Sequence, residues 1–407
     1  MQRHASLDIL RGIAILGILV MNIQSFAMPW TAYAHPHAFG SLEGIHGWTW
    51  LLSHIFADTK FFSLFALLFG AGIALMADRL EERGVNATTV HYRRMVVLGL
   101  IGLAHGFLIW TGDILFMYAV CGLVVYLLHR MRPLPLLITG AGFLAIPVFI
   151  ALIFSWTVPH WPDQAIQQMQ ALWEPGSKMA QQDLATYSAG WLEQLPLRAD
   201  RFLTAITWGL AAEVFWHAGG LMLIGMALYR LGIVTAQRSD RFYVMLMIPA
   251  FLAGFALIFW GLAEIEAREW AFPWTKIVGR QFNNIGAPLV AIGYLCLIML
   301  ACRHATMRRR LGPLAAVGRT ALSNYLLQSL ICTFVFYGHG LGLFGQIERG
   351  GQMLVVVAVW MIQIPLSVWW LRHFHQGPVE WLWRAASRGE WPAFRRPRPG
   401  ASGPGPG

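Results

Sequence analysis

Two histidine–carboxylate pairs lie inside long apolar runs of this 407-residue chain. His54 and Asp58 are four positions apart, so on a helix they share one face. His105 lies among apolar residues and glycines, and Asp113 follows it across a short turn. A carboxylate beside an imidazole sets its tautomer and raises its basicity, which suits the histidine to general-base catalysis. The alternatives are a helix-packing hydrogen bond for the first pair and a helix N-cap for Asp113.

A polar stripe runs along the first apolar segment, LDILRGIAILGILVMNIQSF. Asp8, Arg11 and Asn22 follow helical spacing through Ile15 and Ile18, which predicts that they share one face. Along a helix, Asp8 and Asn22 would lie roughly 21 Å apart. Charged groups facing lipid are unfavourable, so this face must look into a protein interior or a wet cavity.

Two arginines are candidates for binding a phosphate-bearing acyl donor. Arg11 and Arg319 lie toward the same end of their apolar segments, and Asn324 follows on a face adjacent to that of Arg319. Guanidinium groups bind phosphate through paired hydrogen bonds. The alternative is that Arg11 only pairs with Asp8, and Arg319 with a lipid headgroup.

Glu213 and His217 form a third acid–histidine pair with helical spacing. An acid near the middle of a membrane is unfavourable unless it is neutral or paired. The pair therefore indicates either a proton relay or a buried structural contact. His35 and His37 could bind a metal ion, but no acid or cysteine lies at a suitable spacing, so we predict no metal site.

The composition is that of a polytopic membrane protein, because 57% of the residues are hydrophobic and only 12% are charged. Soluble domains carry about 25% charged residues. The net charge of +10 would suggest nucleic-acid binding in a soluble protein. Here it indicates basic cytoplasmic loops instead, and we expect no nucleic-acid partner.

Apolar runs of spanning length recur about ten times, which predicts an all-α helical bundle in the membrane. The predicted spans are 7–28, 48–76, 94–110, 113–129, 134–157, 203–229, 241–265, 284–303, 313–337 and 351–372. With the N-terminus placed inside, about twenty of the 30 Lys and Arg residues fall on the cytoplasmic side. We therefore expect both termini in the cytoplasm.

Three regions are expected along the chain. Residues 1–230 form an N-terminal membrane region with an outer loop at 158–202, and residues 231–384 form a C-terminal membrane domain. The loop is rich in tryptophan, which is typical of an interfacial cap. Residues 385–407 are basic and rich in Pro and Gly, so we expect them to be disordered near anionic lipid headgroups.

Five stretches resemble the YeiB-like family of bacterial membrane proteins, whose C-terminal part is a domain of unknown function numbered 418. They are SLDILRGIAILGILVMNIQSF, DTKFFSLFALLFGAG, HGFLIWTGDILFMY, GRTALSNYLLQS and GPVEWLWR, and they extend from residue 6 to 384. The resemblance implies a multi-pass protein of the bacterial inner membrane. It also implies that residues 231–384 belong to the domain of unknown function.

The pattern Leu10-Arg11-Gly12 followed by Asn22 is also similar to that of heparan-α-glucosaminide N-acetyltransferases. Those enzymes move acetyl groups from cytoplasmic acetyl-CoA to acceptors across a membrane. This second similarity implies an acyl-CoA co-substrate and an acyltransferase-like region at 1–230. It also points to His35 or His37, which lie soon after Asn22, as candidates for the catalytic histidine of that family.

Three hypotheses follow, and the sequence does not decide between them. The first is a membrane acyltransferase with His105 and Asp113, or His54 and Asp58, as its acid–base pair. In this hypothesis Asn22 polarises the acyl carbonyl, and the acceptor is a small molecule or a cell-envelope component. The second is a proton-coupled transporter that uses Glu213, His217 and the His54–Asp58 pair. The third is a non-enzymatic scaffold or lipid-binding protein. No feature of the sequence indicates an oligomeric state.

Overall fold

The computed structural model describes residues 5–396 and confirms an all-α architecture. Among these residues, the only pairing of extended backbone is an isolated bridge between Phe374 and Arg395. Seven helical segments of the described chain are long and apolar enough to cross a membrane, and shorter apolar helices cover Leu115–Leu128 and Ala321–Phe336. The chain is therefore a multi-pass membrane protein.

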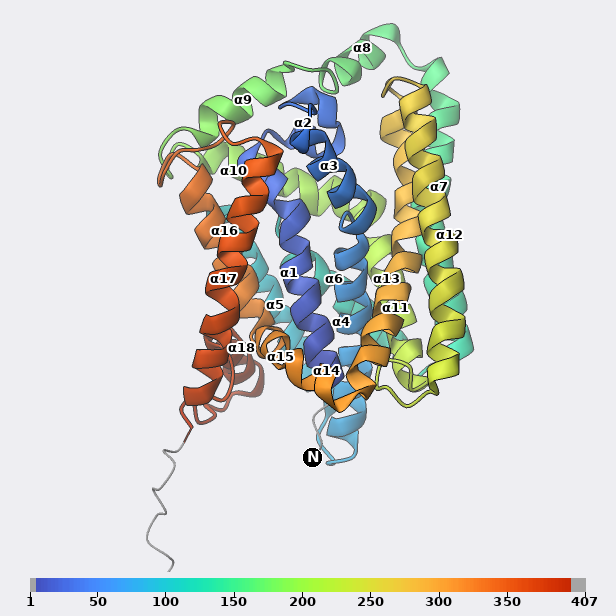
Figure 1. Cartoon of the computed structure of the whole chain (residues 1–407), viewed down its shortest axis with the longest axis vertical. Helices are drawn as coiled ribbons and strands as arrows, with labels where there is room; N and C mark the ends of the chain where they lie inside the picture. The colour runs from blue at the N-terminus through green and yellow to red at the C-terminus, as the bar shows by residue number, and fades with distance from the viewer. Residues whose placement is uncertain (1–4, 397–407) are drawn as a thin grey trace, which may run out of the picture.

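The helices run mostly along one axis (Figure 1). The first half contains α1 (Ala5–Ala27), α2 (Trp30–Ala34), α3 (Ile45–Phe56), α4 (Lys60–Glu81), α5 (Ala87–Leu108), α6 (Leu115–Val125), α7 (Pro133–Thr157), α8 (Asp163–Ala171), α9 (Lys178–Tyr187) and α10 (Leu195–Thr204). The second half contains α11 (Phe215–Arg230), α12 (Asp240–Ala267), α13 (Arg280–Arg303), α14 (Ala305–Arg310), α15 (Gly312–Arg319), α16 (Ala321–Phe336), α17 (Arg349–His373) and α18 (Pro378–Arg388).

The two ends of the bundle differ. The start of α1 lies at the same end as α18, which we call the terminal end (Figure 1). At the opposite end, which we call the capped end, α8, α9 and α10 lie over the bundle together with α2 and α3. Two tryptophans of the predicted cap anchor it: the indole of Trp173 donates to the Trp270 carbonyl at 2.9 Å, and that of Trp191 to the Leu108 carbonyl at 2.8 Å.

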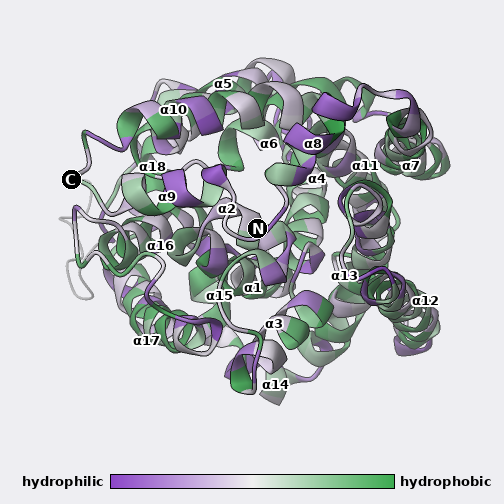
Figure 2. Cartoon of the chain, turned by 90° about the horizontal axis from the view of Figure 1, so that it is seen from above, coloured by the Kyte–Doolittle hydropathy of each residue, from purple (hydrophilic) through white to green (hydrophobic). Residues whose placement is uncertain are grey.

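Helix α1 is the central element of the bundle, because it belongs to both main hydrophobic clusters. Leu7, Ile9 and Leu10 pack with α4, α11 and α13, whereas Leu19 and Ile23 pack with α5, α16 and α17. Seen from above, α1 lies between these two groups of helices (Figure 2). The polar stripe predicted on α1 therefore runs along the seam between two halves of the molecule.

Glycines let the backbones of α1 and α15 come into direct contact where the two helices cross. A Cβ at Gly12 would overlap the carbonyl of Leu314, and a Cβ at Gly318 would overlap the carbonyl of Asp8. The crossing is thus reciprocal, and only residues without a side chain fit there. It fixes the start of α1, including Arg11, next to α15 of the C-terminal region.

Two of the predicted spans are interrupted. The expected helix 48–76 breaks between α3 and α4, where Thr59 has a left-handed backbone with φ of 63°. The expected helix 313–337 breaks at Thr320, between α15 and α16. Neither break is marked by a proline or glycine, the usual signals of interruption, which is why hydropathy alone read each as one helix.

Helix α18 lies at the terminal end and attaches the C-terminal region to the rest of the bundle. The Trp383 indole donates to the Arg94 carbonyl at 2.8 Å, and the Arg94 guanidinium lies 4.1 Å from the centre of the Trp383 ring. The ordered chain continues past the boundary expected at 384, and the Arg396 amide donates to the His373 carbonyl at 2.9 Å. The rest of the expected disordered tail, residues 397–407, lies outside the described residues.

Glu380 of α18 caps the start of α16. Its carboxylate accepts from the Leu322 amide at 2.7 Å, the Ser323 amide at 3.1 Å and the Ser323 hydroxyl at 2.5 Å. Replacing Glu380 with alanine leaves these donors unpaired, so we expect the free energy of unfolding to fall by about 1–3 kcal/mol. Thermal unfolding in detergent measures the loss. Glu390→Ala, which removes an exposed acid of the same segment, should leave the transition unchanged.

The same carboxyl group makes stability depend on pH. Burial raises the pKa of Glu380 above its ordinary value of 4.5, so the folded chain holds this proton more tightly than the unfolded chain. The stability linked to the proton is present in full below pH 4.5 and is lost as the pH rises through the folded pKa. The Glu380→Gln side chain cannot titrate, so the stability of this variant should lack the pH dependence that Glu380 contributes. Identical profiles of stability against pH for the variant and the unmodified protein would contradict the role of Glu380.

Candidate functional site

A cluster of polar side chains lies at the break between α3 and α4. We call His54, Asp58, Thr59, Lys60 and Asn283 the His54 cluster. Nδ1 of His54 lies 3.1 Å from a carboxylate oxygen of Asp58, and about a sixth of each side chain, 16%, remains accessible. Because Asp58 engages Nδ1, the second ring nitrogen of His54 is left to exchange a proton with a ligand.

Asn283 of α13 ties the cluster together. Its amide donates to Asp58 at 3.0 Å, and its carbonyl oxygen accepts from the Lys60 ammonium at 2.5 Å. Lys60 also donates to the His54 carbonyl at 2.7 Å, a group that the end of α3 leaves without a helical partner. The sequence left the partner of Lys60 open; the ammonium group reaches Asp58 through this shared asparagine.

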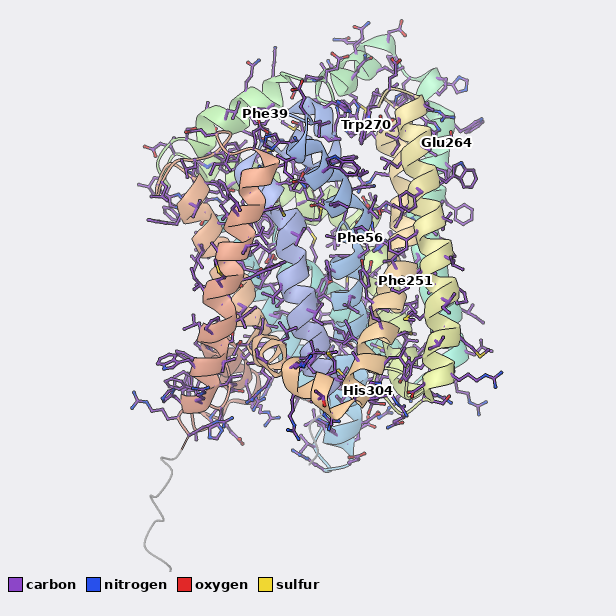
Figure 3. All side chains as sticks on the ribbon, in the orientation of Figure 1. Phe39, Phe56, Phe251, Glu264, Trp270 and His304 are labelled. Carbon is purple, nitrogen blue, oxygen red and sulfur yellow. The ribbon has the colours of Figure 1, made fainter. Side chains whose placement is uncertain are left out.

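Tyr33 of α2 joins the cluster from the capped end. Its hydroxyl lies near Asp58, and the pKa of Tyr33 is raised by burial first and by the Asp58 carboxylate second. Phe56, two residues after His54, lies about halfway between the two ends of the bundle (Figure 3). The cluster therefore lies deep in the bundle, below α2.

A cavity of about 580 Å³ opens at the capped end above this cluster. Its lining combines aromatic rings, imidazoles and carboxylates: His35, His37, Trp173, Trp270, Glu174, Glu266 and Glu269. Trp270 lies 5.6 Å from Trp50, and Trp50 stacks on His54 with ring centres 5.3 Å apart. The cavity is thus separated from His54 by two aromatic side chains.

His35 is part of the wall of this cavity. Its Nδ1 lies 3.0 Å from the Trp173 carbonyl, its ring stacks on that of Trp173, and burial lowers its pKa. His37 lies beside it, with ring centres 5.9 Å apart. Within residues 5–396, no group of three or more His, Cys, Asp or Glu side chains converges as a metal ion would require.

The second predicted pair, His105 and Asp113, is formed but sealed. Nδ1 of His105 lies 2.8 Å from Asp113, and the two residues are 2% and 1% exposed. The other Asp113 oxygen accepts from the Phe116 amide at 2.8 Å, so the carboxylate also caps α6. Tyr325 of α16 covers the imidazole, with ring centres 5.2 Å apart. The pair joins the α5–α6 turn to the C-terminal helices.

We expect Asp113→Ala to destabilise the fold by about 3–5 kcal/mol, because it leaves a buried histidine without its partner. The measurement is the midpoint of thermal unfolding in detergent. Asp163→Ala, at an exposed acid of α8, serves as the matched control. An unchanged midpoint for Asp113→Ala would show that the pair is not a structural contact.

Among the described residues, Glu213 makes no hydrogen bond or ion pair with His217, although its carboxylate acts on the imidazole through its charge. Residues Ala205–Val214 form a π-helix, in which the backbone repeat is longer than in the α-helix assumed from the spacing. Glu213 instead accepts from Arg280 at 2.7 Å and from Asn284 at 3.0 Å, both on α13. His217 is 5% exposed, and its Nε2 has no hydrogen-bond partner among the described residues.

Arginines gather at the terminal end around α1. Arg11 forms an ion pair with Asp8 at 3.4 Å and faces Gly72 of α4. Arg94 lies in the electrostatic field of Arg11 and of two α18 residues, Arg384 and Arg388. The structure therefore places three further arginines near Arg11, besides the Arg11 and Arg319 expected at this end.

The other predicted donor-binding residues have different surroundings. Arg319 donates to the His375 carbonyl at 3.1 Å. Asn324 is 4% exposed, and its amide donates to Thr320 and to Ser367, each at 2.9 Å. Asn324 thus locks α16 against α17. The amide of Asn22 has no hydrogen-bond partner within the described chain, and its side chain is half-buried.

Sequence reasoning missed Tyr33, Asn283, Arg280 and the α18 arginines. The one signal for the α13 residues was the run Arg280-Gln281-Phe282-Asn283-Asn284 directly before an apolar span. Nothing in that run indicates a partner on α4, more than 200 positions away. The partners could be found only in three dimensions.

The chain is similar in sequence to proteins of one family. Residues 228–390 match a family model described as a protein of unknown function, DUF418. The chain is 35% identical to the uncharacterized protein YeiB of Escherichia coli (strain K12) over 386 residues, which cover 94% of this chain and 96% of YeiB. It is 30% identical to the uncharacterized protein YxaH of Bacillus subtilis (strain 168), over 96% of this chain and 95% of YxaH.

Proposed function

Since this chain belongs to the DUF418 family of multi-pass membrane proteins that includes YeiB and YxaH, we propose that it is a transmembrane acyltransferase of the bacterial inner membrane. It passes an acyl group from cytoplasmic acetyl-CoA, or another acyl-CoA, to an acceptor on the outer side. The acyltransferase region is residues 1–230, with α13 of the C-terminal region completing the site.

The orientation proposed for the bundle puts the terminal end in the cytoplasm. In this arrangement α1, α3–α4, α5, α6, α7, α11, α12, α13, α15–α16 and α17 cross the membrane, about ten crossings in all. An even number of crossings agrees with the start of α1 and helix α18 lying at the same end of the bundle (Figure 1). The preference of Lys and Arg for cytoplasmic segments supports the same direction.

The observation that carries this proposal is the geometry of His54. Its imidazole is oriented by Asp58 at 3.1 Å, remains partly accessible, and lies deep in the bundle rather than at one of its ends (Figure 3). Asp58 is itself held by the hydroxyl of Thr59 at 3.2 Å and by the Asn283 amide. A histidine oriented by a fixed carboxylate is the usual general base of acyl transfer.

The reaction assigned to His54 is a direct transfer. The imidazole accepts the proton of an acceptor hydroxyl or amine while the acceptor atom forms a bond to the thioester carbonyl carbon. The carbon–sulfur bond breaks, the acyl group stays on the acceptor, and CoA leaves as a thiolate that takes the proton from His54. Asp58 holds the neutral tautomer at the start and stabilises the imidazolium formed during the step.

The two substrates reach His54 from opposite ends. Arg11, Arg94, Arg384 and Arg388 offer charge for the CoA phosphates at the terminal end. Gly72, which faces Arg11, is twelve residues from Lys60 on α4, so about 18 Å separates them along the helix, and an extended pantetheine arm bridges this distance. The cavity of aromatic rings and carboxylates at the capped end suits an acceptor with hydroxyl or amine groups.

Acyl transfer is tested with the full-length protein in detergent, radiolabelled acetyl-CoA and a cell-envelope extract. We expect label in an acceptor that requires the protein, together with release of free CoA. The absence of both CoA binding and transfer to any fraction would overturn the proposal. Uptake of a solute that a protonophore abolishes, without transfer, would favour the proton-coupled transporter instead, and normal cellular function of a His54→Asn variant would favour a scaffold.

A further inference from the structure

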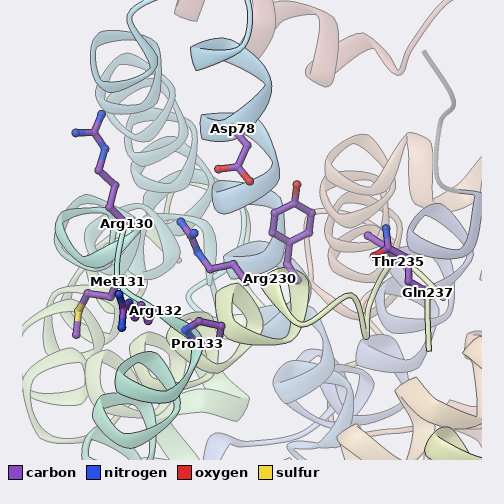
Figure 4. Close-up of a pocket in the computed structure, with 9 residues that line it drawn as sticks. Asp78, Arg130, Met131, Arg132, Pro133, Arg230, Thr235 and Gln237 are labelled. Carbon is purple, nitrogen blue, oxygen red and sulfur yellow. The ribbon is translucent and has the colours of Figure 1, made fainter. Parts of the chain in front are cut away.

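A second cavity, of about 500 Å³, lies at the terminal end and away from the His54 cluster. It is bounded by the end of α4, the loop before α7, the end of α11 and the loop that follows α11 (Figure 4). We call it the basic pocket, and its polar lining residues are Arg130, Arg132, Arg230, Asp78, Thr235 and Gln237. A volume of this size holds a phosphate group together with the small polar molecule that bears it.

The charge of the basic pocket is positive, because three arginines but only one carboxylate are among its lining residues. The carboxylate, Asp78, lies near the hydroxyl of Tyr229. Arg230 is anchored by a hydrogen bond to the His129 carbonyl, which fixes its direction. Arg130 reaches outward to Glu81 at 3.0 Å, an exposed pair of low strength.

Two groups in the basic pocket have no partner within residues 5–396. Arg132 makes no hydrogen bond or ion pair with that part of the chain. The Thr235 hydroxyl is buried and has no hydrogen-bond partner there either. A buried hydroxyl without a partner is unfavourable by about 1–3 kcal/mol, so its site is suited to a polar ligand atom. A free cation and an unsatisfied donor on opposite sides of one cavity fit an oxyanion between them.

We propose that the basic pocket binds a phosphate group. Guanidinium forks recognise phosphate oxygens in pairs, and a hydroxyl supplies a further donor. The pocket lies between helix ends at the expected cytoplasmic face, where basic pockets in membrane proteins bind the headgroups of anionic lipids. The phosphate comes either from such a headgroup or from a soluble molecule, and the chemistry of recognition is the same.

The experiment uses the full-length protein in phosphatidylcholine nanodiscs, with and without cardiolipin. Native mass spectrometry counts retained cardiolipin, and calorimetric titration with inorganic pyrophosphate tests a soluble source. We expect Arg130→Gln/Arg132→Gln to weaken binding about tenfold and Thr235→Val about threefold. Neither change removes a buried contact, so both variants should fold; the control is Arg309→Gln, an exposed arginine of α14 at the same end.

The outcomes separate the two sources. Retained cardiolipin without pyrophosphate binding identifies a lipid headgroup, and pyrophosphate binding without retained lipid identifies a soluble phosphate. The proposal is overturned if neither probe binds, or if the double variant binds as tightly as Arg309→Gln. Both results are independent of acyl transfer.

Discussion

Replacing His54 with asparagine should reduce acyl transfer by roughly 10²- to 10⁴-fold, the contribution of a positioned general base. Asparagine is smaller, but its amide nitrogen can take the place of Nδ1 and keep the hydrogen bond to Asp58; the amide cannot accept a proton. The measurement is the rate of label transfer from acetyl-CoA at saturating donor. Because the His54 side chain is partly accessible and the Lys60 hydrogen bond uses the His54 backbone carbonyl, which the substitution keeps, the fold should be retained.

The control for this loss is donor binding, which should be unchanged in His54→Asn because the CoA phosphates bind at the terminal end. Asp58→Asn should give a smaller loss, since the imidazole remains but loses the partner that sets its tautomer. A His54→Asn protein that transfers acyl groups at the normal rate would remove His54 from the mechanism. In that case the His105→Asn variant should be tested. If it folds but no longer transfers acyl groups, the general base is His105 of the buried His105–Asp113 pair.

Replacing Gly318 with alanine should prevent stable assembly of the bundle. The added methyl group would overlap the backbone carbonyl of Asp8, which is part of α1 and cannot move aside as a side chain can. Forcing atoms into a packed contact is unfavourable by about 1–3 kcal/mol where side chains can adjust, and by more against backbone. The readout is the yield of monodisperse protein in detergent and its unfolding midpoint. Gly12→Ala, on the other side of the crossing, should have the same effect.

Gly142 provides the matched control within a helix. A Cβ added there meets no atom within 4 Å, because this face of α7 is open. Gly142→Ala should therefore raise stability by about 0.4–1 kcal/mol, through the lower backbone entropy of the unfolded chain. Opposite signs at Gly318 and Gly142 would establish that the α1–α15 crossing, rather than loss of a glycine as such, decides the outcome. Equal, small effects at both positions would contradict a backbone-level contact.

Local features of the site could be predicted because their physics is local. The His54–Asp58 pair was predicted from four-residue spacing and forms although α3 ends at Phe56, and the His105–Asp113 pair follows from a short turn between two apolar runs. Membrane insertion follows from composition. Glu213 and His217 had the same spacing as His54 and Asp58, but a π-helical stretch changed the repeat, and Arg280 of a distant helix supplied a better partner.

Two arginines at the capped end, Arg198 and Arg349, illustrate the limit of counting charges. Arg198 is buried and donates to the Leu108 carbonyl at 2.7 Å. Arg349 is also buried, and its guanidinium binds the carbonyls of Pro36, Phe39 and Ser41. Each of these two buried guanidinium groups stabilises a neighbouring loop at the capped end by donating to its backbone carbonyls. The rule for topology treats all cations alike, whereas burial and carbonyl partners separate structural arginines from surface ones.

The sequence by itself determined that this chain enters a membrane, that its helices carry acid–histidine pairs, and that α1 bears a polar stripe, since hydropathy and helical periodicity act over a few turns. Only the tertiary structure decided which pair stays accessible, that Asn283 joins Asp58 to Lys60, and which arginines surround Arg11. These are contacts between residues far apart in the chain. The free energy of these contacts comes from packing and from hydrogen bonds to polar groups that are away from water. The type of one residue does not indicate which distant residue becomes its partner in the folded protein.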